Sequence, residues 1–189
     1  CYEGLAIINN RSGKEAFAET KQRYERFTND KQKTDKISPA EARQELLSLK
    51  EIVKLDIRIL NNFIKDTDPS VSESSKVFAE NKNGIEKTIA SLKDFSASID
   101  SNLALMDSTL LKIQLAKNEA DLRFEEAKRN LASGNFSAAR RNIELSRTRT
   151  NDALQLEEDE EYRQMTDERL DKLGKEINDA ENAVVVKDV

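Results

Sequence analysis

Side chains that could carry out chemistry are few in this sequence, and they form no known catalytic pattern. The 189 residues include no histidine, which removes the commonest general base and metal ligand. No glycine-rich phosphate loop, nucleophile elbow or Glu-x-x-His pattern is present. We therefore expect no catalytic, cofactor-binding or metal-binding residues, and we do not expect an enzyme.

Cys1 is the only cysteine, and it has two interpretations. A bacterial lipoprotein begins with a lipidated cysteine after its signal peptide is removed, and lipid attachment at Cys1 would place the chain in the bacterial envelope or periplasm. The alternative is the boundary of an excised segment, since Tyr2-Glu3-Gly4-Leu5-Ala6-Ile7-Ile8 is not the usual small polar tether. One cysteine forms no intrachain disulfide, so a cytoplasmic location also stays open.

Two clusters of charge could bind an ion or a partner. The acidic run at 157–161 could hold a divalent cation or a basic protein. Consecutive acids on a helix spread around its circumference, however, so a solvated helical segment is favoured. A basic cluster, which could meet an acidic partner, consists of Lys128, Arg129, Arg140, Arg141, Arg147 and Arg149. We expect it to form ion pairs with the nearby carboxylates of Glu125, Glu126 and Glu144.

The composition favours long helices around a thin core. Charged residues make up 35% of the chain and aromatic residues 5%, with five glycines and two prolines, too few turn residues for an all-β protein. The net charge of −5 comes from interspersed acids and bases, so nucleic-acid binding is disfavoured. No apolar run approaches the roughly 18 residues of a membrane span, and we expect no transmembrane segment.

Apolar residues at helical spacing predict four main helices, at 14–29, 38–65, 71–132 and 137–182. Within 71–132 the spacing persists without proline, so we expect one long helix whose weak points are Gly84 and residues 100–102.

The second helix has the clearest start signal. Ser38 is a candidate N-cap, Pro39 suits the first helical position, and Glu41 completes a capping box.

An apolar stripe from Ile85 to Ile113 lies on the third of these helices. We expect it to pack inside the chain, against 38–65 and 14–29. Its approximate heptad spacing leaves a second interpretation open, the seam of a coiled-coil homo-oligomer.

One motif, within residues 124–146, points to a family. It has a small residue in a first helix, a Gly-Asn-aromatic turn, and then small, large apolar and small residues at intervals of three, four and three. These positions hold Ala127, Gly134, Asn135, Phe136, Ala139, Ile143 and Ser146. The pattern resembles the turn of a tetratricopeptide repeat. The resemblance implies that Gly134 ends the first helix with a positive φ, that Asn135 caps the second, and that the alanines allow close helix packing.

The departures from that family are clear. Its helices are short, with a period near 34 residues, whereas the helices here are long and no second copy of the turn is visible. The resemblance implies a divergent relative with a protein-binding surface and no catalysis.

We therefore expect an all-α fold, an elongated antiparallel bundle of long helices with a tetratricopeptide-like hairpin, forming a single region over 1–189 at the front of a longer protein. The expected function is a protein-interaction scaffold or adaptor for an unidentified protein partner. Two alternatives are a bacterial surface lipoprotein acting as spacer or adhesin, and a self-assembling coiled-coil protein.

Overall fold

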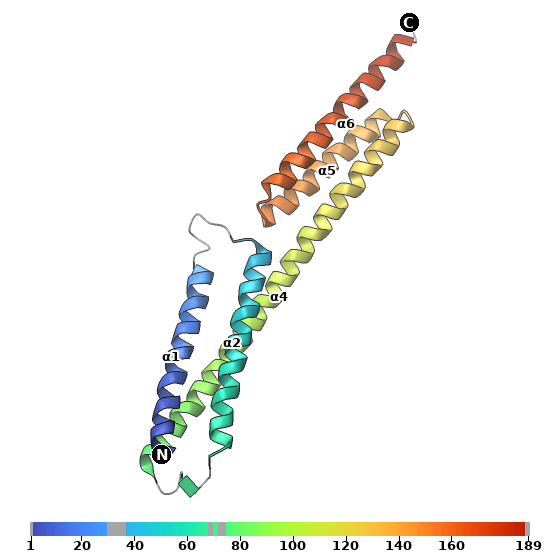
Figure 1. Ribbon diagram of the computed structural model, residues 1–189. Coiled ribbons are helices and arrows are strands. Elements are labelled where there is room, and N and C mark those ends of the chain that lie inside the picture. Colours follow the sequence, from blue (N-terminus) through green and yellow to red (C-terminus); the bar gives the residue numbers. More distant parts are fainter. Residues whose placement is uncertain (1, 30–36, 68–69, 72–74, 188–189) are drawn as a thin grey trace. The chain divides into compact units, whose positions relative to one another are not determined.

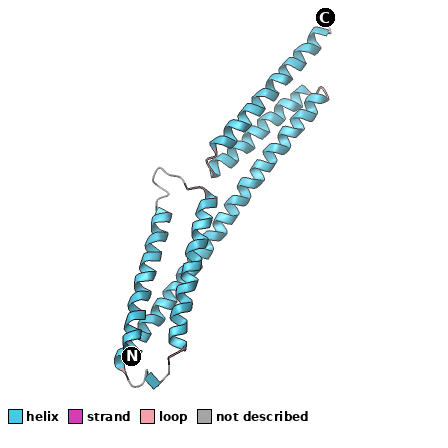
Figure 2. Ribbon diagram, viewed as in Figure 1, coloured by secondary structure: helices cyan, strands magenta, loops and turns pink. Residues whose placement is uncertain are grey.

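The computed structural model describes residues 2–29, 37–67, 70–71 and 75–187, and all regular structure in this part of the chain is helical (Figures 1 and 2). The all-α prediction is confirmed. The helices are α1 (Tyr2–Asn29), α2 (Pro39–Lys65), α4 (Lys76–Ala132), α5 (Phe136–Leu156) and α6 (Glu160–Lys187).

The described residues divide into two packed units where we had expected a single region. Unit 1 is Cys1–Asp107 and unit 2 is Ser108–Val189. The helix α4 contributes its first part to unit 1 and its last part to unit 2. Within each unit, helices that follow one another in the chain run antiparallel (Figure 1).

Unit 1 buries the apolar stripes of α2 and α4 against each other, with aromatic residues of α1 at the edge. The buried core consists of Leu46, Leu49, Val53, Leu60, Ile85, Ile89, Leu92, Phe95, Ile99 and Leu103. Phe95 meets the rings of Phe17 and Tyr24 edge-on, at centroid distances of 5.9 and 5.0 Å. The stripe that was predicted to pack inside the chain does so over 85–103. Ile113, its predicted last member, is buried in unit 2.

The start of α2 has the predicted capping box. The Ser38 hydroxyl oxygen accepts a hydrogen bond from the Glu41 amide (3.2 Å), and the Glu41 carboxylate accepts one from the Ser38 amide (2.9 Å). Pro39 occupies the first turn, where its missing N–H leaves no bond unmade. The hydrogen bonds from Ser38 lower the pKa of Glu41, because they favour its charged form.

The first helix begins at Tyr2, so the predicted start at residue 14 was wrong. Gly13, directly before the predicted start, has a packing role. It is buried inside α1, and a Cβ there would lie 3.1 Å from both methyl carbons of Leu60. A residue without a side chain thus allows α1 to approach α2 closely.

The predicted helix at 137–182 was also wrong, because it is two helices. α5 ends at Leu156 and α6 begins at Glu160. The break falls inside the acidic run, where the Asp159 carboxylate accepts a hydrogen bond from the Tyr162 amide (2.9 Å) and so caps α6.

The third helix begins at Lys76, later than predicted, and is continuous through residues 100–102 as expected.

Replacing Ser38 by alanine should lower the free energy of unfolding by about 1 kcal/mol, because the Glu41 amide loses its partner. Urea unfolding followed by circular dichroism measures this. The control is Ser98→Ala, an exposed serine inside α4 whose hydroxyl bonds only the Asp94 carbonyl. Its stability should stay equal or rise slightly, since alanine favours helix. Equal losses in the two variants would contradict the capping role.

Candidate functional site

The turn between α4 and α5 has the hydrogen bonds of a Schellman motif. Gly134 has a φ of 72°, a conformation that side chains disfavour. The Asn135 amide donates to the Asn130 carbonyl (2.8 Å) and the Gly134 amide to the Leu131 carbonyl (3.0 Å), which satisfies the last carbonyls of α4. The Asn135 side chain accepts from the Ala138 amide (3.4 Å) and caps α5.

The remaining predicted hairpin residues gather in one apolar cluster. Ala127 of α4 and Ala139 of α5 are fully buried, and Ile143 is 6% exposed. Phe136 is half-buried against them. The cluster also contains a stripe of α6 that the motif did not include, Leu170, Leu173 and Ile177. Alanines on both sides of the turn leave room for the third helix to cover the hairpin.

Two buried hydroxyl groups lie deeper between the helices of unit 2. The Ser146 hydroxyl donates to the Ala120 carbonyl (2.7 Å), and the Thr150 hydroxyl donates to the Ser146 carbonyl (3.0 Å). Ser146, the last residue of the motif, and Ala120 are fully buried. A bond from a side chain of α5 to the main chain of α4 requires close helices, so small residues continue the close contact away from the turn.

Lys117 lies at the centre of a polar cluster that joins α4 to the segment between α5 and α6. Its ammonium group lies 2.9 Å from Asp159, 3.7 Å from Glu157 and 4.5 Å from the centre of the Tyr162 ring. Burial opposes the charge of Lys117, but the hydrogen bond and charge of Asp159, with the charge of Glu157, raise its pKa overall. The hydrogen bonds from Tyr162 and Lys117 lower the pKa of Asp159. Sequence reasoning missed this cluster, since Lys117 lies 42 residues before Asp159.

The basic cluster forms ion pairs, but mostly with carboxylates that were not predicted. Lys128 pairs with Glu125 (3.1 Å) as expected. The arginines of α5 pair elsewhere: Arg140 with Glu181, Arg147 with Asp167 and Asp171, and Arg149 with Glu119 and Asp152. Most of these pairs join α5 to α6 or α4. Their side chains are well exposed, so each pair contributes little to stability.

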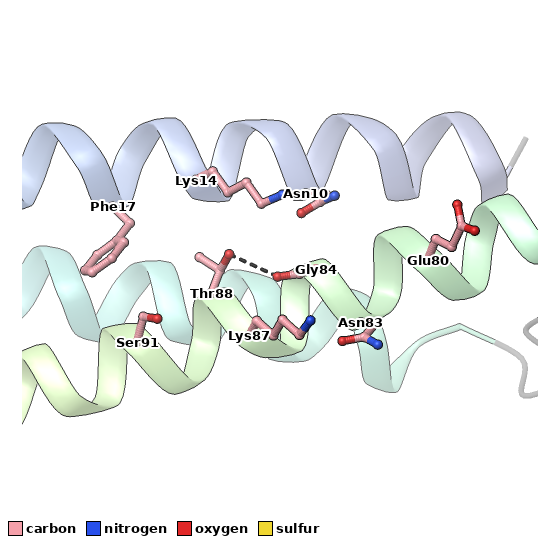
Figure 3. A pocket seen from close by; sticks show the side chains of 9 residues that line it. All are labelled: Asn10, Lys14, Phe17, Glu80, Asn83, Gly84, Lys87, Thr88 and Ser91. Atoms are coloured by element: carbon pink, nitrogen blue, oxygen red, sulfur yellow. Dashed lines mark hydrogen bonds between the residues drawn. The ribbon is translucent and has the colours of Figure 1, made fainter.

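Unit 1 contains an open groove of about 520 Å³ between α1 and α4 (Figure 3). It is lined by Asn10, Lys14, Phe17, Glu80, Asn83, Gly84, Lys87, Thr88 and Ser91. Lys14 and Lys87 supply two ammonium groups. The Thr88 hydroxyl donates a hydrogen bond to the Gly84 carbonyl within α4 (3.1 Å). The Glu80 carboxylate in the same lining opposes an anion, and both lysines are exposed, so water would screen their attraction.

Gly84, in the lining of the groove, lies close to Asn10 of α1. A Cβ at this position would lie 2.5 Å from the Oδ1 atom of Asn10. The Asn10 amide group donates to Asn81 (2.8 Å), while its Oδ1 atom is buried and has no partner among the described residues. The sequence marked Gly84 only as a weak point of a helix, because the Asn10 side chain that needs its space lies 74 positions earlier.

A smaller cavity of about 150 Å³ lies between α1 and α2 and contains one carboxylate. The Oδ2 atom of Asp56 is buried there and has no partner within the described part of the chain. Burial raises the pKa of Asp56, because desolvation disfavours its charged form. The remaining lining is mostly apolar or small, with two polar side chains, Asn9 and Ser12. The Asn9 amide group donates to the Leu5 carbonyl of its own helix (2.8 Å).

No group of three or more metal-binding side chains occurs within the described ranges. None of the helices there is long and apolar enough to cross a membrane. Cys1, the predicted lipid-attachment residue, lies outside the described residues.

Replacing Asp159 by asparagine should remove the charge that Lys117 contacts while keeping an N-cap. We expect a loss of at most about 1 kcal/mol at pH 7, since the pair is partly solvated. The folded-state pKa of Asp159 is lowered, so its contribution is complete above the ordinary carboxyl pKa of about 4 and disappears as the pH falls through the lowered value.

Urea unfolding at several pH values measures this difference, with Glu161→Gln in the exposed first turn of α6 as a control. A difference between wild type and Asp159→Asn that stays constant into acid would contradict the ion-pair assignment.

Gly84→Ala should be less favourable in the wild type than in an Asn10→Ala background. Without Asn10, alanine should stabilise α4 by about 1 kcal/mol through helix propensity. With Asn10 present, the clash should cancel this gain. A double-mutant cycle of unfolding free energies gives the coupling. Gly174→Ala in α6, where a Cβ would meet nothing within 4 Å, should show the full gain. Additive effects at 10 and 84 would disprove the contact.

Comparison with known proteins finds a relative but no family model. No family model matches the chain, and no solved structure matches it. An uncharacterized protein of Treponema pallidum (strain Nichols) is 31% identical over 176 aligned residues, which cover 79% of this chain. The chain spans about a sixth of that relative's length, 16%.

Proposed function

We propose that this chain is a non-enzymatic protein-interaction scaffold whose second unit uses tetratricopeptide-like packing. The hairpin carries the proposal. Its turn combines a positive-φ glycine with an asparagine cap, and its helices meet at Ala127 and Ala139. Repeats of this kind stack helical hairpins and bind proteins along the exposed helix faces. α6 covers the hairpin as the first helix of a following repeat would.

The outer face of α5 is the binding surface we favour. It carries side chains of mixed chemistry that do not enter the packed cluster, Arg141, Glu144, Leu145 and Thr148. Leu145 is 37% exposed, and Arg141 lies four residues before it on the same face. Arginine is enriched at protein interfaces, where its guanidinium group makes charge-assisted hydrogen bonds, and the exposed leucine beside it offers apolar contact.

The test is affinity capture from native extract with the whole chain as bait. The test variant carries Arg141→Glu and Leu145→Ser, and the matched control carries Arg58→Glu and Leu55→Ser on the exposed face of α2. Circular dichroism should show that both keep the wild-type helix content, since all four positions are exposed.

A protein that is retained by the wild type and the control but lost with the α5 variant supports the proposal, and we expect this result. Equal recovery with all three baits would mean that the α5 face is not the binding surface. Failure of every bait to retain any protein above a blank matrix would contradict the scaffold function.

A further inference from the structure

The part of α4 in unit 2 carries a row of leucines that no other helix among the described residues covers. Leu111, Leu115 and Leu122 are 59%, 58% and 50% exposed. Their spacings of four and seven residues place them on one face of the helix. Single exposed leucines are ordinary on protein surfaces, but three aligned over two heptads form a seam of the kind that packs helix against helix.

This leucine row faces away from the core of unit 2. The buried residues of the same stretch are Ile113, Ala120 and Ala127. Ile113 follows Leu111 by two positions and Ala120 precedes Leu122 by two, and two positions correspond to about 200° around a helix. The α5 and α6 contacts and the leucine row therefore occupy opposite sides of α4, so the row is not needed for the fold of unit 2.

The charged side chains beside the leucine row carry one excess negative charge, which a second copy of the chain could neutralise. Glu119 lies 3.0 Å from Arg149 and 3.8 Å from Arg123. These arginines also pair with Asp152 and Glu126, at 2.9 and 2.8 Å. Three carboxylates thus share two guanidinium groups, which leaves one negative charge. Lys112 lies on the same flank of α4, seven residues (about two helical turns) before Glu119. It is exposed and has no ion pair among the described residues.

We propose that α4 pairs with α4 of a second copy of this chain, antiparallel, through the leucine row. Leu111 of one copy would face Leu122 of the other, and Leu115 would face Asn118. This register brings Lys112 of each copy to Glu119 of the other and neutralises the excess negative charge there. The contact is isologous, so it closes as a dimer and does not continue into a filament.

Charge also disfavours the neighbouring registers. A shift by one heptad in one direction would bring the two copies of Lys112 together. The opposite shift would place the two copies of Glu119 side by side. A parallel arrangement would bring Asp121 of one copy toward Glu126 of the other. Each of these is a like-charge contact, which destabilises helix pairing. The parallel arrangement would also bring Lys112 toward Asp107, but Asp107 is already paired with Arg43 (2.5 Å). The proposed antiparallel register joins the two Leu111–Leu122 contacts to a charge pair at Glu119, the carboxylate beside the excess negative charge.

Sedimentation equilibrium of the whole chain over a concentration range from about 1 µM to 1 mM should show a monomer–dimer equilibrium. Leu115→Ser with Leu122→Ser should weaken it at least tenfold, because each dimer loses four leucine side chains. These positions are exposed, so helix content should not change. Leu55→Ser on α2, also 52% exposed, is the matched control and should leave the equilibrium unchanged. A chain that stays monomeric at 1 mM, or a leucine variant that dimerises like the wild type, would overturn the proposal.

Two further measurements test the charge pair and the direction. Lys112→Glu should weaken dimerisation more than Lys112→Gln, and equal effects would remove the charge argument. The relative direction of the two α4 helices is tested with Cys1→Ser chains that carry either Ser108→Cys or Glu125→Cys. Each variant is oxidised alone, and a mixture of the two reduced variants is oxidised in parallel. These positions extend the seam by three residues at each end and face each other in the proposed register. Disulfide dimers should form mainly between the two variants. Dimers formed equally well by each variant alone would overturn the antiparallel register.

Dimerisation and the scaffold function fail separately. The leucine row is on α4 and the favoured partner face is on α5. Loss of partner capture with dimerisation intact would count against the scaffold alone, and a strictly monomeric chain that still captures its partner would count against the dimer alone.

Discussion

Close approach of helices at small residues is the constraint on which both units depend. With a third of its residues charged, each helix has only a narrow apolar stripe to bury. A thin stripe gives enough packing contact only where backbones come near one another. The chain meets this need with Gly13 and Gly84 in unit 1, and with Ala120, Ala127 and Ala139 in unit 2. The same short distance allows Ser146 to reach the main chain of a neighbouring helix.

Polar groups add to the stability that the thin apolar cores provide, mainly by fixing where helices begin and end. Ser38, Asn135 and Asp159 each satisfy amide groups at a helix start, and Gly134 satisfies carbonyls at a helix end. Asp159 has a second role, because it also binds Lys117 from α4. It therefore joins a local signal, the cap, to a tertiary contact. The exposed ion pairs along α5 and α6 add orientation more than stability.

Features that depend on neighbouring residues could be predicted from the sequence, and features that depend on distant ones could not. The capping box at Ser38 and the turn at Gly134 are local, so the sequence was sufficient for both. The start of the first helix was placed after Gly13, because Leu60, the residue that Gly13 packs against, lies on another helix. The acidic run was read as continuous helix because glutamates favour helix, which hid the N-cap at Asp159. The pairing of Lys117 and the groove at Gly84 depend on contacts across 42 or more positions, for which the sequence has no periodic signal.

The continuity of α4 has a consequence for hydrogen exchange. Amide protons exchange when the structure around them opens, and each packed unit opens with its own free energy. In α4, amides near Leu92 belong to the core of unit 1, whereas those near Ala120 and Ala127 belong to the core of unit 2. A single uninterrupted helix should then carry two levels of protection, one for each unit. Amides of α4 that lie between the two cores belong to neither. Their exchange should report on local opening of the helix itself.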